Sequence, residues 1–267
     1  MKKKKVTKKK ATKKKIKEKE IKSGKPAIKY KYHNSAGRLL AILELANISG
    51  PRAKNIHVWS KVSGLSVDQR VQIYGFLVKL SELLDDTETR ILAMDLPSAR
   101  TNYVQNTFAA LKDVLLSCNL NGYWGSSKKR IDQATLAFLE FCAFSLGEDG
   151  TISEDELAEI YTSIGDVFKQ VSDSNLNKDL KALLLRLLVS IKSAIDDYWI
   201  GGVDGIRHSC SAIIVEIKRH QDLLKSHSTQ PWMKKLFNMV VKLDGIVAKA
   251  IKYRKLLEYV VPKLDSK

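Results

Sequence analysis

Residues 231–260 read PWMKKLFNMVVKLDGIVAKAIKYRKLLEYV. Apolar residues recur here at alternating intervals of four and three, and only Arg254 interrupts them: Leu236, Val240, Leu243, Val247, Ala250 and Leu257. This spacing places the side chains on one face of an α-helix, as in a helix bundle or coiled coil. The other side carries lysines, which are compatible with a solvated face or with phosphate contacts. The stretch predicts a long helix that begins at Pro231 and buries one face against other helices.

Helical periodicity continues back to Asn34, and no segment shows the sustained alternation of a strand. We expect helices near 35–47, 51–62, 66–95, 98–119, 127–146, 153–172, 177–199, 204–226 and 231–260. The predicted fold class is therefore all-α, a multi-helix bundle of about eight or nine helices. Residues 34–267 form one helical domain in this prediction, and two stacked sub-bundles, 34–125 and 126–267, are the alternative within it.

The N-terminal 33 residues differ sharply from the rest of the chain. They hold sixteen lysines against Glu18 and Glu20, a net charge of +14, which leaves only +3 of the formal +17 for residues 34–267. Their few apolar residues cannot offset the entropy of ordering the chain, and like charges repel. We therefore expect residues 1–33 to be a disordered polycationic tail.

Such a tail attracts polyanions, because each lysine that meets a phosphate releases condensed counterions. Non-specific binding to nucleic acid is the first expectation, and an anionic lipid surface or an acidic protein is the second. A tail that only keeps the chain soluble is the third. The predicted nucleic-acid contacts in the tail are Lys2, Lys3, Lys4, Lys5, Lys8, Lys9, Lys10, Lys13, Lys14 and Lys15.

The remaining composition predicts the compartment. Three cysteines, Cys118, Cys142 and Cys210, lie in apolar stretches without paired spacing, which is typical of buried free thiols in a reducing compartment. No apolar run reaches the length of a membrane helix, and no apolar segment of a signal peptide follows the lysines. We expect a cytoplasmic protein without a membrane span.

Residues 147–157, GEDGTISEDEL, resemble the second half of a calcium-binding loop of the EF-hand type. With Gly150 at position 6, Glu156 falls at position 12, but positions 1 and 3 lack carboxylates. A helix start explains the same residues, with Ser153 as N-cap and Glu156 closing a capping box. The sequence therefore predicts a helix N-terminus here, and it predicts no metal and no cofactor for the chain.

Two further motifs suggest contact with nucleic acid. Arg52 and His57 have the Arg-x4-His spacing of HEPN-type ribonucleases, and this resemblance implies RNA cleavage by the pair as an alternative function. Ala53 stands where that family has a polar residue. Residues 121–130, NGYWGSSKKR, combine Tyr123 and Trp124 with Lys128, Lys129 and Arg130. Aromatic rings beside cations are typical of single-strand binders, although the two rings also suit a plug between helices.

These observations predict a non-enzymatic helical interaction protein, an accessory subunit that a lysine-rich arm tethers to nucleic acid. Its helical body is expected to contact a protein partner or a second copy. The HEPN-like ribonuclease using Arg52 and His57 is the chief alternative. A structural helical subunit with a solubilising tail is the other.

Overall fold

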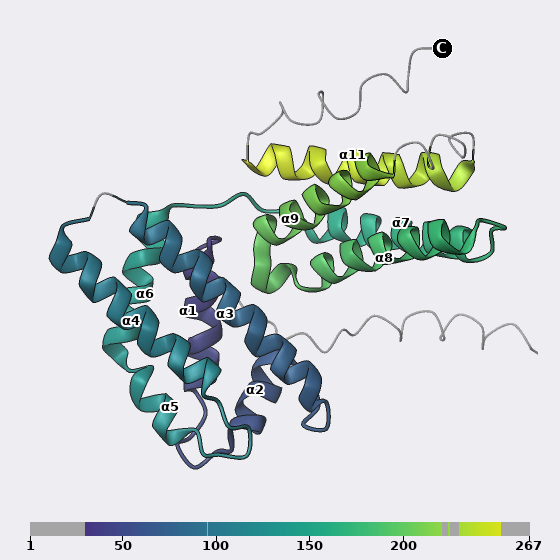
Figure 1. The fold of residues 1–267 in the computed structure, drawn as a ribbon. Coiled ribbons are helices and arrows are strands. Elements are labelled where there is room, and N and C mark those ends of the chain that lie inside the picture. The colour runs from purple at the N-terminus through teal and green to yellow at the C-terminus, as the bar shows by residue number, and fades with distance from the viewer. Residues whose placement is uncertain (1–29, 95, 221–223, 225–229, 252–267) are drawn as a thin grey trace, which may run out of the picture.

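The computed structural model describes residues 30–94, 96–220, 224 and 230–251. Within these ranges the chain forms ten helices and no strand, so the predicted all-α class is confirmed (Figure 1). The predicted tail lies outside the described residues, except for Tyr30 to His33. The first six helices are α1 (Ser35–Asn47), α2 (Asn55–Ser63), α3 (Arg70–Leu92), α4 (Ser98–Leu116), α5 (Gly125–Arg130) and α6 (Gln133–Leu146). The others are α7 (Glu154–Ser172), α8 (Lys178–Asp196), α9 (Tyr198–Arg219) and α11 (Pro231–Ile251).

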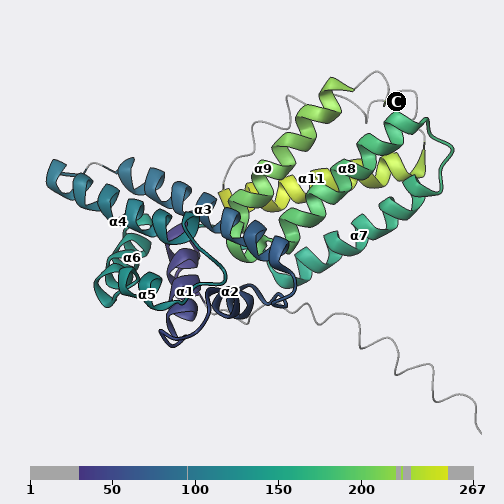
Figure 2. The same cartoon turned by 60° about the horizontal axis from the view of Figure 1, so that its bottom comes forward.

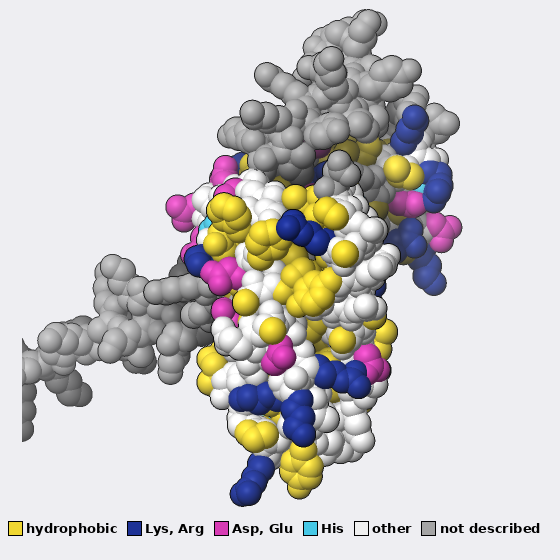
Figure 3. Space-filling view, turned by 90° about the vertical axis from the view of Figure 1, so that its left-hand side faces the viewer, with side chains coloured by type: hydrophobic (Ala, Val, Ile, Leu, Met, Phe, Trp, Pro, Cys, Tyr) yellow, Lys and Arg dark blue, Asp and Glu magenta, His cyan; other side chains and the backbone are white. Residues whose placement is uncertain are grey.

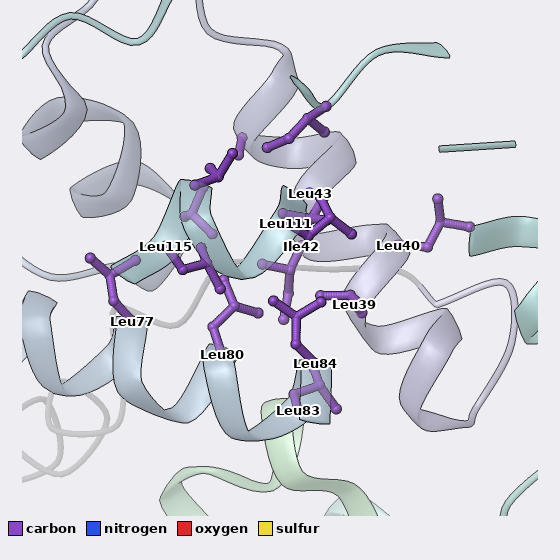
Figure 4. Close-up of a cluster of buried hydrophobic side chains, with 14 of the residues drawn as sticks. Leu39, Leu40, Ile42, Leu43, Leu77, Leu80, Leu83, Leu84, Leu111 and Leu115 are labelled. Atoms are coloured by element: carbon purple, nitrogen blue, oxygen red, sulfur yellow. The ribbon is translucent and has the colours of Figure 1, made fainter. Parts of the chain in front are cut away.

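Helix α1 forms the centre of a first core cluster that α2 to α6 complete. Its sequence, SAGRLLAILELAN, is apolar on most of its circumference, and α3 and α6 pack on different sides of it. Leu39 and Ile42 of α1 lie opposite Leu80 and Leu84 of α3, and all four side chains are fully buried (Figure 4). A helix that is apolar on most sides is stable only when other helices surround it, and α1 occupies such a position.

Helices α7, α8, α9 and α11 enclose a second core cluster. The apolar face predicted for the last long helix is present in α11, where Leu236, Val240 and Leu243 are buried. Pro231 is the first residue of this helix, as predicted. The predicted continuation to residue 260 lies outside the described residues.

The two clusters lie side by side (Figures 1 and 2). Along the chain, the buried apolar residues belong to the first cluster up to Ala143 and, apart from Ile200, to the second cluster from Ile152 onward. Residues 131–143 therefore pack with the first cluster, whereas the predicted sub-bundles placed them in the second. Whether the clusters are separate domains stays a prediction. Across the boundary, Trp199 at the start of α9 stacks on Phe76 of α3, with ring centroids 5.6 Å apart. Ile200 belongs to the first cluster, so the corner between α8 and α9 inserts into it.

Several predicted helix bounds were wrong, for local reasons. The expected helix 127–146 is two helices, because Asp132 accepts a hydrogen bond from the Thr135 amide and starts α6 anew. The expected helix 51–62 begins only at Asn55, since Pro51 and Arg52 form a turn. The expected helix 177–199 ends at Asp196, and the expected break before residue 204 is present as the non-helical backbone of Gly202, with φ of 57°, inside α9.

The capping box at the start of α7 is confirmed. The Ser153 hydroxyl accepts from the Glu156 amide at 3.3 Å, and the Glu156 carboxylate accepts from the Ser153 amide at 3.1 Å. Gly147 ends α6 with φ of 70°. The acidic loop between these helices therefore serves as a helix connection, and its remaining carboxylates bind groups of the protein itself, as described below.

Candidate nucleic-acid interface

Two segments about seventy positions apart in the sequence meet at one end of the first cluster. Lys54 and Tyr123 form an isolated antiparallel bridge. Beside it, the Asn55 amide donates to Gly122 O at 2.9 Å and the Trp124 amide donates to Ala53 O at 2.8 Å. Directly paired residues project to the same side of such a ladder, and their neighbours project to the other. Lys54 and Tyr123 therefore project to one side of the bridge, called the outer side, and their neighbours Asn55 and Trp124 project to the inner side.

The inner side is anchored in the core. Trp124 is fully buried and packs edge-on against Trp59, with ring centroids 5.4 Å apart and planes at 88°. Asn55 is buried as well, and its side-chain amide donates to Asn119 O at 2.8 Å. Trp124 is therefore the predicted plug between helices and is not available for stacking on a base.

The outer side is basic and carries one exposed aromatic ring. Tyr123 is 64% exposed, in contrast to its buried neighbour, and Lys54 projects beside it. The Arg70 guanidinium reaches the same loop and donates to the side chain of Asn121 at 2.9 Å. Figure 3 shows Lys and Arg side chains gathered at this lower end, where Figure 1 places α5. We name this surface the basic end: Arg52, Lys54, Arg70, Tyr123, Lys129 and Arg130.

The three predicted cations of α5 have different surroundings. Lys128 is half-buried, and its ammonium donates to Asn47 O at 2.7 Å and to Ser49 O at 2.9 Å, at the C-terminus of α1. A cation at that position stabilises the negative end of a helix dipole. Arg130 pairs with Asp113. Lys129 is exposed and makes no ion pair within the described part of the chain. Of the three, Lys129 is the residue most open to a phosphate.

Arg52 and His57 are close in the sequence and are both exposed. Arg52 lies in the turn before α2, and His57 lies in the first turn of that helix. The hydrogen bonds and ion pairs of the described residues do not join their side chains. The HEPN-like alternative therefore stays a prediction from spacing, whereas Arg52 gains a second role as a cation of the basic end.

The predicted tail contacts Lys2 to Lys15 lie outside the described residues, but the point where the tail joins the fold is described. The Tyr30 hydroxyl donates to Trp199 O at 2.6 Å, and Lys31 pairs with Glu140 of α6. The His33 amide donates to Glu148 at 2.8 Å, and the Asn34 side chain donates to Ala143 O at 2.7 Å. Burial raises the pKa of Tyr30 to about 12. Residues 30–33, which were predicted to belong to the tail, thus pack on the fold against α6, the loop after it and the start of α9.

The acidic loop binds arginines of the fold. Asp149 accepts two hydrogen bonds from the Arg90 guanidinium, at 2.6 and 3.0 Å, and lies 3.7 Å from Arg38. Arg90 Nη1 also lies 3.7 Å from Asp204 of α9. The hydrogen bond to Asp149 raises the pKa of Arg90, whereas burial lowers the pKa of Arg38. This network of two arginines and two aspartates joins α1, α3 and the loop to α9.

A surface cavity lies beside this network. Its volume is about 560 Å³, and its walls include Arg38, Lys79, Asp86 and Asp204. Lys79 already pairs with Asp197 at 2.5 Å, so the fold itself uses much of the charge that lines the cavity. In the described ranges, no group of three or more His, Cys, Asp or Glu side chains is arranged to hold a metal ion.

A second exposed surface is apolar. Helix α6, QATLAFLEFCAFSL, contains Glu140 as its sole charged residue. Phe141 and Phe144 on its outer side are 57% and 72% exposed, and Tyr103 of α4, 51% exposed, packs edge-on against Phe138 beside them. Exposed aromatic clusters of this kind are typical of contact surfaces. No helix in the described part of the chain is both long and apolar enough to cross a bilayer.

Part of this site could be predicted from the sequence. Arg52 and residues 121–130 were predicted as two separate motifs, but no pattern indicated that they meet, or that Lys54 and Arg70 lie with them. Lys54 lies inside the Arg-x4-His segment without being one of its two defining residues, and Arg70 belongs to no local motif, so only the fold brings them to Tyr123. Comparison with protein family models, with curated proteins and with solved structures finds no match to this chain.

Proposed function

We propose that this chain is a non-enzymatic helical interaction protein that binds nucleic acid through its lysine-rich N-terminal segment and through the basic end. The supporting observation is the meeting of residues 52–54 with residues 121–130, which gathers cations around an exposed tyrosine at one end of a body whose total charge is near neutral. Basic side chains that meet phosphates supply most of the affinity of non-specific binding.

Simple chain lengths support the binding of both basic regions to one strand. The tail joins the fold at the N-terminus of α1, and the basic end lies at the C-terminus of that helix. Thirteen helical residues span only about 20 Å, and twenty-nine residues can reach at most about 100 Å. Both regions can therefore contact neighbouring phosphates of the same polyanion.

The outer face of α4 and α6 supports the second part of the proposal, contact with a protein partner or a second copy. Phe141, Phe144 and Tyr103 would leave water in such a contact, and an almost uncharged helix meets a second copy without like-charge repulsion. The cytoplasm is the compartment that best suits the three free cysteines.

The direct test is a salt titration of binding to RNA and to DNA with the full chain. We expect a linear fall of log K with log salt concentration, with a slope of several units, because many lysine–phosphate contacts release counterions. Binding that is absent at low salt, or that does not change with salt, would contradict the proposal and leave the tail with a solubilising role.

A further inference from the structure

We infer that the basic end binds single-stranded nucleic acid, with an unpaired base stacked on the ring of Tyr123. This inference rests on the proposed function. It adds that the ligand is single-stranded and that Tyr123 contacts one of its bases. Three features of the described residues carry it: a fixed backbone, an exposed ring and flanking cations.

The backbone on both sides of Tyr123 is held in place. Gly122 O accepts from the Asn55 amide, and the next amide, of Trp124, donates to Ala53 O. The indole of Trp124 is fully buried against Trp59. The turn before Tyr123 is also fixed, because the Asn121 amide donates to the Asn119 side chain at 3.0 Å. Binding therefore orders little of the protein main chain, which lowers its entropic cost.

The ring is more exposed than a tyrosine of the core requires. Tyr123 is 64% exposed, and its hydroxyl makes no hydrogen bond within the described residues. The pairing with Lys54 sets the ring on the outer side of the ladder. The exposed part of this aromatic ring offers a flat surface to a base. Base–aromatic stacking tolerates any sequence, since every base has a π-face.

Cations come from both sides of Tyr123 in the chain and from the segment paired with it. Lys54 is beside it, Arg70 is fixed at Asn121 on the N-terminal side, and Lys129 follows on the C-terminal side. A strand whose base stacks on Tyr123 would thus meet positive charge at the phosphates before and after that base. A duplex keeps its bases stacked on each other, so it could use only the cations. The arrangement favours a single strand.

The test measures binding of the full chain by fluorescence anisotropy to three probes: oligothymidylate of about 16 nucleotides, its duplex with oligoadenylate, and an abasic strand of the same length. The variants are Tyr123→Ala and Tyr123→Phe. Tyr161→Ala serves as matched control, because it removes an exposed tyrosine of α7, away from the basic end and from the outer face of α4 and α6. Circular dichroism of each variant checks that the fold is retained.

We expect Tyr123→Ala to weaken binding of the single strand about tenfold, within the range of alanine substitutions at stacked bases. Tyr123→Phe and Tyr161→Ala should bind like the wild type. The weakening should persist at every salt concentration, since the ring carries no charge, and it should be absent with the duplex and the abasic strand.

Equal affinity of Tyr123→Ala and wild type for oligothymidylate would overturn the inference while leaving the proposed function intact. An equal weakening on all three probes would also overturn it, because the ring would then act only through the shape of the basic end. No binding of the wild type to any probe would overturn both the inference and the proposed function.

Discussion

Arg38 shows how single residues connect the two core clusters. Its side chain is buried, its Nε donates to Ile200 O at 2.9 Å, and Asp149 lies 3.7 Å from its Nη1. A buried arginine is tolerated only when its charge is paired and its donors are satisfied. Gly202 makes this possible, because its φ of 57° turns the backbone at the corner and its missing Cβ leaves room for the guanidinium.

Gly202→Ala should therefore destabilise the protein by about 1–3 kcal/mol. The new Cβ would lie 2.4 Å from Arg38 Nη1, and this side chain cannot move aside without giving up its buried partners. The neighbouring Gly201 is the control, because a Cβ there meets nothing within 4 Å. Urea unfolding measures both variants, and equal effects of the two substitutions would show that Arg38 does not depend on Gly202.

The cysteines make a prediction about pH. Burial raises the pKa of Cys142 and of Cys210 to about 12, so at pH 8 each is ionised in roughly one molecule in ten thousand. Both thiols should resist a thiolate-specific reagent such as DTNB in the folded protein and react rapidly in urea. Because the folded pKa lies above the ordinary value of 9.0, the free energy of unfolding should fall as the pH rises above 9. Rapid reaction at pH 8 without urea would contradict the buried placement.

At the scale of the element, adjacent cations of α5 have different surroundings. Lys128 donates to two carbonyls at the end of α1, whereas Lys129 is exposed at the basic end. The sequence, KKR, presents these residues as one basic motif. Their division depends on where α1 ends, about eighty positions earlier in the chain, so a local motif cannot reveal it.

Lys128→Ala and Lys129→Ala should therefore affect different properties, the first the stability of the protein and the second its binding of nucleic acid. The first should lower the free energy of unfolding by about 1–2 kcal/mol, because two backbone carbonyls would be left without a charged donor. The second should leave stability unchanged and weaken binding of nucleic acid. Thermal unfolding and anisotropy measured on the same samples check both. Weaker binding with unchanged stability in Lys128→Ala would contradict the assignment.

Most helices could be predicted because their signals are local. Ser153 and Glu156 specify the start of α7 within four residues, and the spacing of Leu236, Val240 and Leu243 specifies the buried face of α11. The break between α5 and α6 was missed because Ile131, a buried residue of the first cluster, continues the apolar periodicity across it. Here the cap at Asp132 outweighed the pattern.

At the scale of the whole molecule, long-range placement could not be predicted. The pairing of Lys54 with Tyr123 and of Asp149 with Arg90 joins residues about sixty or seventy positions apart, and no periodicity encodes such pairs. The net charge of residues 34–267, +3, does not show where their cations lie. The fold gathers cations at one end and surrounds the carboxylates of the acidic loop with arginines. Charge is thus segregated within the body as well as between body and tail.

The central claim is that the tail and the basic end bind one polyanion together. The measurement that tests it most directly is a salt titration of oligonucleotide binding with four proteins: the full chain, the chain without residues 1–29, a Lys54→Gln, Lys129→Gln variant, and the combination of both changes. Residues 30–33 are kept because Tyr30 and His33 contact the fold.

We predict that deletion of the tail removes the larger part of the salt slope, at about 0.7 for each lysine that no longer meets a phosphate of a single strand. The Lys54→Gln, Lys129→Gln change should lower the remaining affinity further, and the combined protein should bind most weakly. Unchanged affinity and slope after deletion of residues 1–29 would contradict the claim.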